Sequence, residues 1–243
     1  MFYRRNVAEL WMNNSTIMQF IDKELQQLFA APLFEGLDQT LLEEIKDQVI
    51  LFSVKRGENL SDIVSTRGAL FFVIKGTLKW NVLDVNGEWR IIKFVTPNDV
   101  INVHAMLSNK SKQERFIANN DSQLFVLKES LIDELKMKDP SFMLKLISLA
   151  TKEATYIEKH ANKLMSYPLK ERLILAVSDW AKKFGLTEDN RINLKLSKKE
   201  IANFIAASKS SMNRLIHEME DSQTLRIEQN QVRVIDPNIL NLN

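Results

Sequence analysis

Basic and short polar side chains gather in one stretch near the C-terminal end of the sequence. Between residues 191 and 215 there are six lysines and arginines, and Glu200 is the single acidic residue. Ammonium, guanidinium and hydroxyl groups donate hydrogen bonds, and a focused basic field is what binding to a polyanion requires. A solvated helix face is the alternative interpretation of a basic run alone, so the spacing of these residues decides between the two.

The first half of this stretch predicts a short capped helix. Ser197 is followed three residues later by Glu200, which is the pattern of a capping box. Ile201, Phe204 and Ile205 then recur at helical spacing and give the helix a buried face. Three polar residues at the start of this helix are candidate contacts to DNA phosphate. They are Ser197, Lys198 and Lys199.

A second helix is predicted after a short turn at residues 206–207. Ser208 is its expected N-cap, and residues 209–219 carry an apolar face formed by Met212, Leu215, Ile216 and Met219. The first turns of this helix carry donors and acceptors suited to base edges in a major groove. The candidate DNA-contacting residues here are Ser208, Lys209, Ser210, Ser211, Asn213 and Arg214.

Two short β-type segments follow the helix pair. Residues 225–228 and 232–235 flank a polar Gln-Asn-Gln turn and predict a two-stranded wing. A plain helical hairpin is the alternative, but it does not explain why polar and basic residues collect at one helix start. We therefore predict a winged helix-turn-helix that binds double-stranded DNA.

Composition excludes several other chemistries. The 243 residues are enough for two domains, and 45% hydrophobic and 26% charged residues are ordinary for a soluble protein. With no cysteine there is no disulfide, thiolate zinc site, cysteine nucleophile or cysteine-held iron–sulfur cluster. The three histidines are far apart, so no metal site or cofactor is predicted. No catalytic motif, membrane-spanning run or secretory signal is recognisable, and we expect a cytoplasmic protein that is not an enzyme.

The residue pattern in the middle of the chain predicts an antiparallel sheet. Helices are expected at residues 13–28 and 38–49, and short apolar runs then alternate with turn signals up to residue 127. Asn86-Gly87 lies between two such runs and predicts a hairpin with a type I′ turn. Regular spacing of short strands indicates a β-roll or barrel.

A long helix is expected between this sheet and the helix pair. Phe142, Leu146 and Leu149 form one apolar stripe, which we assign to the core of the same chain. A second stripe has the heptad spacing of a helix that pairs with a copy of itself. Its members, the candidate dimerisation residues, are Met143, Ile147, Ala150, Ala154, Ile157, Ala161 and Leu164. A single helix lying on its own core is the alternative to a homodimer.

Proline and glycine divide the C-terminal part of the chain. Pro168 breaks the long helix, so residues 166–168 are the expected hinge, and Gly185 ends the next helix. The predicted domains are residues 1–138 with the N-terminal helices and β-roll, residues 139–165 with the dimerisation helix, and residues 169–243 with the winged helix-turn-helix. The fold class is α+β.

The sequence resembles the Crp/Fnr family of bacterial transcription regulators from about Phe34 onward. The strongest motif runs from Leu196 to Arg214, and Arg56-Gly57-Glu58, Ile74-Lys75-Gly76 and the segment 168–172 fall at further family positions. The resemblance implies a cyclic-nucleotide-binding-like roll, binding to a pseudo-palindromic operator and contact with RNA polymerase. It also implies that Lys209, Ser210 and Arg214 are the main base-reading residues.

The same resemblance implies that cyclic AMP is not the effector. Asn102 and Val103 stand where cyclic-AMP-binding members have a Gly-Glu pair, and Phe116 after Arg115 replaces a serine. Glu158 falls near the position of an adenine contact. These five residues are the candidate effector pocket. The cysteines of oxygen-sensing members are absent. His104 could ligate a haem as in haem-sensing members, but a lone histidine is more often structural.

Two functional hypotheses remain open at this point. The first is a transcription regulator whose small-molecule effector is unidentified or absent. The second is a cytosolic ligand-binding or scaffold protein with a vestigial helix-turn-helix. DNA binding separates them.

Overall fold

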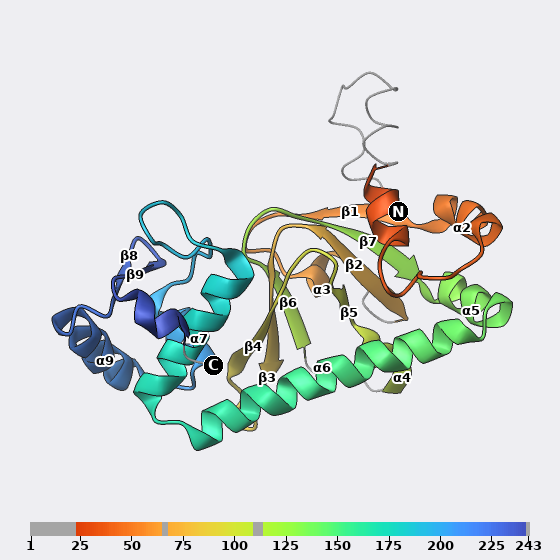
Figure 1. Ribbon diagram of the computed structural model, residues 1–243. Helices are drawn as coiled ribbons and strands as arrows, with labels where there is room; N and C mark the ends of the chain where they lie inside the picture. Colours follow the sequence, from red (N-terminus) through yellow and green to blue (C-terminus); the bar gives the residue numbers. More distant parts are fainter. Residues whose placement is uncertain (1–22, 65–67, 109–113, 242–243) are drawn as a thin grey trace. The chain divides into compact units, whose positions relative to one another are not determined.

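The computed structural model describes residues 23–64, 68–108 and 114–241 (Figure 1). Contacts divide the chain into two compact units. The N-terminal unit comprises residues 1–89 and 93–155, and the C-terminal unit comprises residues 90–92 and 156–243. The expected helix at residues 13–28 lies largely outside the described residues, and the described part is helical at residues 23–29.

The N-terminal unit begins with helices and continues as two antiparallel sheets. Helix α2 (Gln39–Ile45) starts at the predicted cap, where the Asp38 carboxylate accepts from the Thr40 amide at 2.8 Å, and the 3-10 helix η1 (Lys46–Gln48) follows. One sheet has the order β1-β7-β2-β5 and the other β4-β3-β6. The strands are β1 (Ile50–Val54), β2 (Ala69–Lys75), β3 (Leu78–Leu83), β4 (Trp89–Val95), β5 (Val100–Ile101), β6 (Glu114–Ala118) and β7 (Ser122–Lys128).

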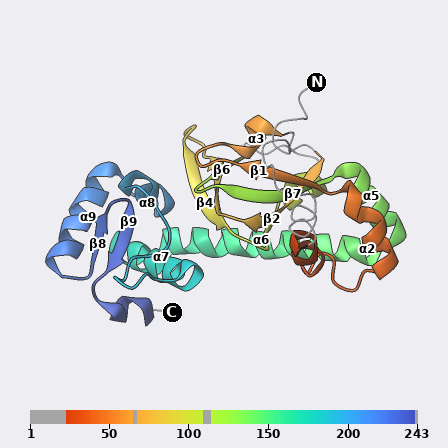
Figure 2. The same ribbon diagram turned by 90° about the horizontal axis from the view of Figure 1, so that it is seen from above.

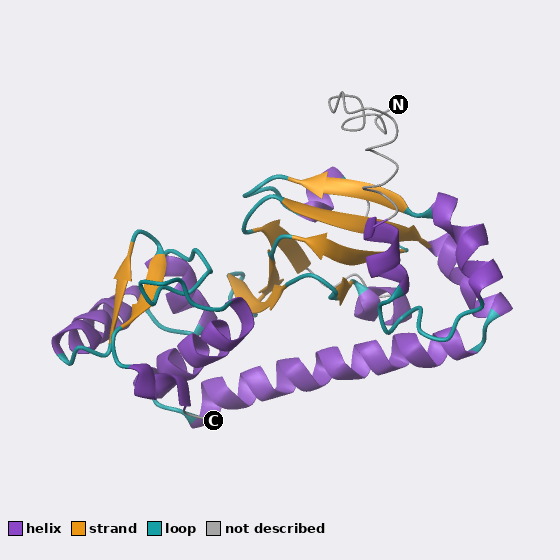
Figure 3. Cartoon of the chain, turned by 45° about the horizontal axis from the view of Figure 1, so that its top comes forward, coloured by secondary structure: helices purple, strands orange, loops and turns teal. Residues whose placement is uncertain are grey.

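Short helices join these strands. Helix α3 (Leu60–Ile63) precedes β2, α4 (Val103–Ser108) follows β5, and α5 (Glu129–Lys138) follows β7. The apolar run of β2 is buried from Ala69 to Ile74, because this strand lies inside its sheet between β7 and β5. In Figure 3 nearly all strands belong to this part of the chain, as the alternation of apolar runs and turns predicts.

The core of the N-terminal unit lies between the sheet of β2 and β7 and the surrounding helices. Phe72 of β2 and Phe125 of β7 are buried together with Leu131 and Leu135 of α5. Helix α6 (Ser141–Ser166) closes this core with its first turns, where the predicted inward stripe is found: Phe142 and Leu146 are fully buried and Leu149 packs beside them.

The hairpin between β3 and β4 differs from the prediction in its turn. A type I′ turn requires positive φ at both central residues, but of the pair only Gly87 has it. The Gly87 amide instead donates to the carbonyl of Asp84 at 3.0 Å, and the Asp84 carboxylate accepts from the amides of Asn86 and Glu88. The aspartate side chain thus organises a longer turn, with the glycine in the left-handed position at its end.

The C-terminal unit is mainly helical, with one hairpin (Figure 2). Its elements are α7 (Leu169–Phe184), α8 (Lys198–Phe204), α9 (Lys209–Asp221), β8 (Leu225–Glu228), β9 (Gln231–Val234) and the 3-10 helix η2 (Pro237–Asn241). The predicted helix break and stop signal are confirmed, because α6 ends at Ser166, α7 begins after Pro168, and Gly185 caps α7 with φ of 74°. That residues 166–168 act as an interdomain hinge stays a prediction.

One apolar core holds these elements together. Val177 and Trp180 of α7, Ile201 of α8 and Met219 of α9 are buried, and Val232 closes the core from the wing. At the C-terminal end, the Ser178 hydroxyl of α7 donates to the carbonyl of Leu240 at 3.0 Å, which attaches η2 to α7. Among the described residues no helix has the length and apolar character needed to cross a membrane.

Candidate DNA-binding surface

Helix α8 begins with the capping box that the sequence predicts. The Ser197 hydroxyl accepts from the Glu200 amide at 3.3 Å, and the Glu200 carboxylate accepts from the Ser197 amide at 2.9 Å. This reciprocal pair satisfies amides that would otherwise be orphaned at the helix start. Lys198 and Lys199 in the first turn are exposed, so their charges face solvent next to the positive end of the helix.

The turn between α8 and α9 depends on a strained alanine. Ala206 has φ of 54°, a left-handed conformation that residues other than glycine rarely adopt. The Ala207 amide donates to the carbonyl of Ala202 at 2.8 Å and closes this turn. The sequence predicts the turn at the correct residues, but nothing in it marks Ala206 as left-handed.

Helix α9 separates its buried and exposed residues cleanly. The Ser208 hydroxyl caps it by accepting from the Ser211 amide at 3.1 Å, as predicted. The predicted apolar face of Met212, Leu215, Ile216 and Met219 is buried, and the helix ends at Asp221, two residues later than expected. The opposite face presents the exposed side chains of Lys209, Ser210, Asn213 and Arg214, while Ser211 is half-buried.

The wing is a tight hairpin attached to the start of α8. Gln229 and Asn230 have φ of 51° and 61°, so the type I′ turn occurs here rather than at Asn86-Gly87. The Asn230 carbonyl accepts from the Leu196 amide at 2.7 Å, directly before the Ser197 cap. Strand β9 begins at Gln231, one residue before the predicted start.

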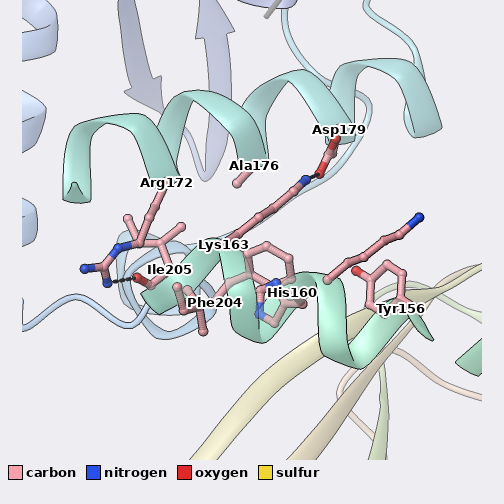
Figure 4. A pocket seen from close by; sticks show the side chains of 10 residues that line it. Tyr156, His160, Lys163, Arg172, Ala176, Asp179, Phe204 and Ile205 are labelled. Carbon is pink, nitrogen blue, oxygen red and sulfur yellow. Dashed lines mark hydrogen bonds and ion pairs between the residues drawn. The ribbon is translucent and has the colours of Figure 1, made fainter. Parts of the chain in front are cut away.

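A pocket of about 140 Å³ lies where the end of α6 meets α7 and α8 (Figure 4). The His160 ring packs on Phe204 of α8, with 4.6 Å between the ring centroids. Lys163 of α6 pairs with Asp179 of α7 at 2.6 Å. These contacts join the last turns of α6 to α7 and α8.

Arg172 of α7 is a positioning residue that the sequence analysis missed. Its guanidinium donates to the carbonyl of Tyr167 in the expected hinge at 2.8 Å. It also donates to the carbonyl of Ile205 at 3.2 Å (Figure 4). It therefore connects the hinge to the turn that precedes α9. The sequence around Arg172 does not indicate that its side chain will contact the Ile205 carbonyl, because Ile205 is distant in sequence.

His160 is held in its neutral form by its surroundings. Burial lowers the pKa of the His160 imidazole below its usual 6.5, and the nearby Lys163 ammonium lowers this pKa further. The Asp179 carboxylate acts in the opposite direction but does not compensate. The ring that packs on Phe204 is therefore uncharged at neutral pH.

The candidate effector residues have internal partners in the N-terminal unit. The Asn102 amide donates to the carbonyl of Ala69 at 2.6 Å, and Val103 is buried. The Arg115 guanidinium lies 3.9 Å from the centre of the Trp89 ring. Phe116 is 2% exposed and stacks on Trp80 with 5.9 Å between centroids.

The fifth candidate effector residue belongs to the other unit. Glu158 lies on α6 within the C-terminal unit, where its side chain is exposed. The described residues contain no group of three or more histidines and carboxylates arranged to hold a metal ion.

Two domain families match the chain. Residues 51–139 match the cyclic nucleotide-binding domain, and residues 171–242 match the Crp-like helix-turn-helix domain. Together the two matches span about two thirds of the sequence. They fall on the two regions in which the sequence places a β-roll and a winged helix-turn-helix.

Known regulators share this organisation. The transcriptional regulatory protein Btr of Bordetella pertussis is 23% identical over 204 residues, which are 83% of this chain and 81% of the relative. A Crp/Fnr regulator from Eubacterium rectale has a TM-score of 0.69 at 15% identity, covering 87% of this chain and 98% of that structure. The c-di-GMP-responsive regulator CLP of Xanthomonas campestris has a TM-score of 0.70 at 11% identity, covering 82% of this chain and 100% of that structure.

The order of elements, the capped helix pair and both domain matches agree with one another. An antiparallel β-roll, a long helix and a C-terminal helix-turn-helix follow each other as in these regulators. The chain belongs to the Crp/Fnr family of transcription regulators and carries that family's helix-turn-helix DNA-binding domain.

Proposed function

We propose that the protein is a homodimeric transcription regulator that reads a pseudo-palindromic operator with the exposed face of α9. The observation that carries this proposal is the separation of the two faces of that helix. Four apolar side chains are buried, while Lys209, Ser210 and Arg214 remain exposed beside the capped helix start. A recognition helix needs this arrangement to enter a major groove with its first turns.

The three base-reading candidates differ in what they can recognise. Arg214 can make the bidentate contact to guanine that arginine forms most often in major grooves. Ser210 has a single short hydroxyl and accepts several bases, so we expect weak discrimination at its position. The operator should therefore be most constrained at the base pair read by Arg214.

The direct test is to select an operator from random DNA with the purified protein and then measure Arg214→Ala. We expect specific binding to weaken by about 1–3 kcal/mol, because alanine cannot hydrogen-bond the base, with little change on random DNA. Lys182→Ala is the matched control, since Lys182 is an exposed cation in the last turn of α7. Equal reductions on operator and random DNA would show that Arg214 reads no base. If no sequence is enriched at low salt, the regulator hypothesis fails and the scaffold hypothesis gains support.

The proposed dimer uses the long helix α6. Of the predicted seam, Ile147, Ala154 and Ala161 are exposed, while Ala150 packs against the core of its own unit and Leu164 lines the pocket. Exposed positions spaced alternately by three and four residues run along one face of α6. They are Leu144, Ile147, Thr151, Ala154, Glu158, Ala161 and Met165. We therefore propose that the dimer contact on α6 is centred between the predicted stripe and this exposed stripe.

The dimer is tested by Ile157→Lys, with Ser148→Lys as its control. Ile157 is half-buried and lies beside the proposed seam, whereas Ser148 is exposed about half a turn away around the helix. We expect Ile157→Lys to give a monomer by sedimentation and to lose operator binding, because two half-sites must be held together. A monomer with full operator affinity would contradict the dimer, as would Ser148→Lys dissociating to the same extent.

We further propose that cyclic AMP does not control this protein. Phe116 is part of the buried core and has no group that could hydrogen-bond a cyclic phosphate, and Arg115 lies on the Trp89 ring without a serine beside it. Contact with RNA polymerase is proposed from family membership. Transcription from a promoter carrying the selected operator tests it, and an unchanged rate on adding the protein would contradict it.

A further inference from the structure

The pocket at the end of α6 lies wholly within the C-terminal unit. Its lining residues come from the last turns of α6, from α7, and from α8 with the residue that follows it. Much of the lining is apolar or aromatic, and it includes Tyr156, His160, Ala176, Phe204 and Ile205. The rings of Tyr156 and His160 are nearly parallel, with 6.4 Å between their centroids and 10° between their planes. Such a lining favours a ligand with a flat ring.

The pocket has the size of a single aromatic ring. Its volume is about 140 Å³. An apolar cavity of about 150 Å³ can hold one benzene molecule. The pockets that hold drug-sized ligands are larger, at roughly 300–1,000 Å³. The volume therefore selects a ligand with one six-membered ring rather than a nucleotide.

The charged residues of the lining leave an excess of positive charge. The Lys163 ammonium is paired with Asp179, the only acid among the lining residues, at 2.6 Å. Lys159 is exposed and Arg172 is half-buried. The lowered pKa of His160 keeps its imidazole neutral, so three cations face one carboxylate and two positive charges remain. The lining is thus complementary to an anion.

Arg172 has hydrogen-bond donors left for such an anion. Its Nε atom donates to the Tyr167 carbonyl. Its Nη1 atom donates to the carbonyl of Ile205, which also lines the pocket (Figure 4). In the described part of the chain, the Nη2 group and the second hydrogen of Nη1 have no acceptor. A guanidinium with N–H groups left on both terminal nitrogens binds a carboxylate through two parallel hydrogen bonds.

The carbonyl that Arg172 holds belongs to the turn that leads into α9. Ile205 is followed by Ala206, whose backbone is left-handed, and by Ser208, which caps α9. A ligand that fixes the Arg172 guanidinium in this position therefore stabilises the arrangement from which α9 begins. Ligand and operator should then strengthen each other's binding, since coupling between two sites is reciprocal.

We propose that this pocket binds a monocyclic aromatic carboxylate, with the carboxylate on Arg172 and the ring against His160 and Phe204, and that the bound anion strengthens operator binding. The site lies outside residues 51–139, which match the cyclic nucleotide-binding domain. Binding of the anion is independent of DNA, whereas its role as an effector rests on the proposed function. A free aromatic acid is favoured over an acidic side chain of another protein, because the volume accommodates a ring.

The binding test uses the full chain without DNA and benzoate as the probe, titrated by ligand-observed NMR. We expect benzoate to bind at least tenfold more tightly than benzyl alcohol, which lacks the charge, and than acetate, which lacks the ring. Arg172→Gln should weaken benzoate binding at least tenfold, because the carboxylate loses its charged partner. Ala176→Leu should have the same effect, because the larger side chain fills the pocket.

Lys182→Gln is the matched control, since it removes an exposed charge of α7 outside the pocket and should bind benzoate like wild type. Circular dichroism confirms that the variants fold, and Arg172→Lys should recover part of the affinity because it keeps the charge. If Arg172→Gln does not fold, Lys159→Gln tests the same charge complementarity at an exposed position. It should weaken benzoate binding severalfold and leave benzyl alcohol unaffected.

The site is overturned if benzoate binds no more tightly than benzyl alcohol, or if either Arg172→Gln or Ala176→Leu binds it like wild type. Acetate binding as tightly as benzoate, the result expected of a surface for acidic side chains, would also overturn it.

The effector role is tested by operator affinity at saturating benzoate, with acetate in the reference so that ionic strength is equal. We expect an increase of about fivefold or more in wild type and none in Ala176→Leu. Unchanged operator affinity in wild type would overturn the effector role. Benzoate binding without any operator binding would instead count against the proposed function.

Discussion

The two ends of the chain treat their polar side chains in opposite ways. In the C-terminal unit, Lys209, Ser210 and Arg214 stand exposed on a helix whose other face is fully packed. In the β-roll, Asn102 donates to a backbone carbonyl and Arg115 rests on an indole ring. The DNA-binding end leaves these donors exposed, whereas the β-roll engages its candidate ligand-binding groups in contacts with its own residues.

If cyclic AMP is not the effector, as proposed, the β-roll keeps its scaffold without that ligand chemistry. Phe116 is 2% exposed and stacks on Trp80, so it now contributes apolar burial where the resemblance expects a serine. Burial of aromatic area is a large stabilising contribution, and each such side chain adds to it. Phe116 therefore has a packing role that requires no ligand.

The largest effect on this contrast is expected from Phe116→Ala, which should reduce the free energy of unfolding of the N-terminal unit by about 3–5 kcal/mol. The reason is that removing a buried aromatic ring leaves a cavity against Trp80. Urea denaturation followed by tryptophan fluorescence measures the change.

The neighbouring Arg115→Ala serves as the contrast for this experiment. Its side chain is exposed and its contact with Trp89 is worth about 0.5–1 kcal/mol. If the free energies of unfolding of the two variants agreed within about 1 kcal/mol, Phe116 would not be a core residue. That result would contradict the contrast between the packed residues of the β-roll and the exposed residues of the DNA-binding end.

A smaller effect is expected at the DNA-binding end for Ser197→Ala. Removing the hydroxyl leaves the Glu200 amide without its cap and should cost about 1 kcal/mol, seen as faster amide hydrogen exchange in α8. Ser148→Ala on α6 is the control, since that exposed serine caps no helix. Unchanged exchange in α8 would mean that the capping box does not stabilise the helix pair.

The last expected effect concerns pH and His160 of α6. Because the folded protein lowers the pKa of His160, the unfolded chain takes up a proton first as the pH falls below about 6.5. Stability should therefore decrease between about pH 7 and pH 5, by no more than about 1.4 kcal/mol per pH unit for one proton. In His160→Gln this part of the pH dependence should vanish. A variant with the same slope as wild type would assign the dependence to other groups.

Local signals in the sequence predict the helix pair almost completely. The capping box at Ser197, the cap at Ser208 and the apolar face of α9 all lie where expected, because each depends on residues close together along the helix. The same holds for Asp38 and Gly185, which cap helices through their own side chain and backbone.

Turn geometry is predicted less well. Asn86-Gly87 favours a type I′ turn by its residue types, yet the Asp84 carboxylate binds two amides and selects a longer turn. Gln229-Asn230 forms the tighter turn with less favourable residues, because its ends are held by the strands and by Leu196. Hydrogen bonds from outside the central pair override local preference in both hairpins.

Interactions between distant residues could not be predicted. The donation from Arg172 to the Ile205 carbonyl and the packing of His160 on Phe204 require the helices to be placed first. The register of Arg226 with Arg233 likewise follows from the wing turn, which shifts β9 to begin at Gln231.

The most direct test of the contrast between the two ends is the affinity of purified protein for its selected operator, measured with and without cyclic AMP. Fluorescence anisotropy at fixed salt is suitable, because salt strongly affects protein–DNA affinity. We predict the same dissociation constant in both conditions, since Arg115 lies on the Trp89 ring and Phe116 is buried against Trp80 where a cyclic phosphate would need a hydrogen-bonding partner. An increase in operator affinity of about tenfold or more on adding cyclic AMP, equivalent to about 1.4 kcal/mol, would contradict this account.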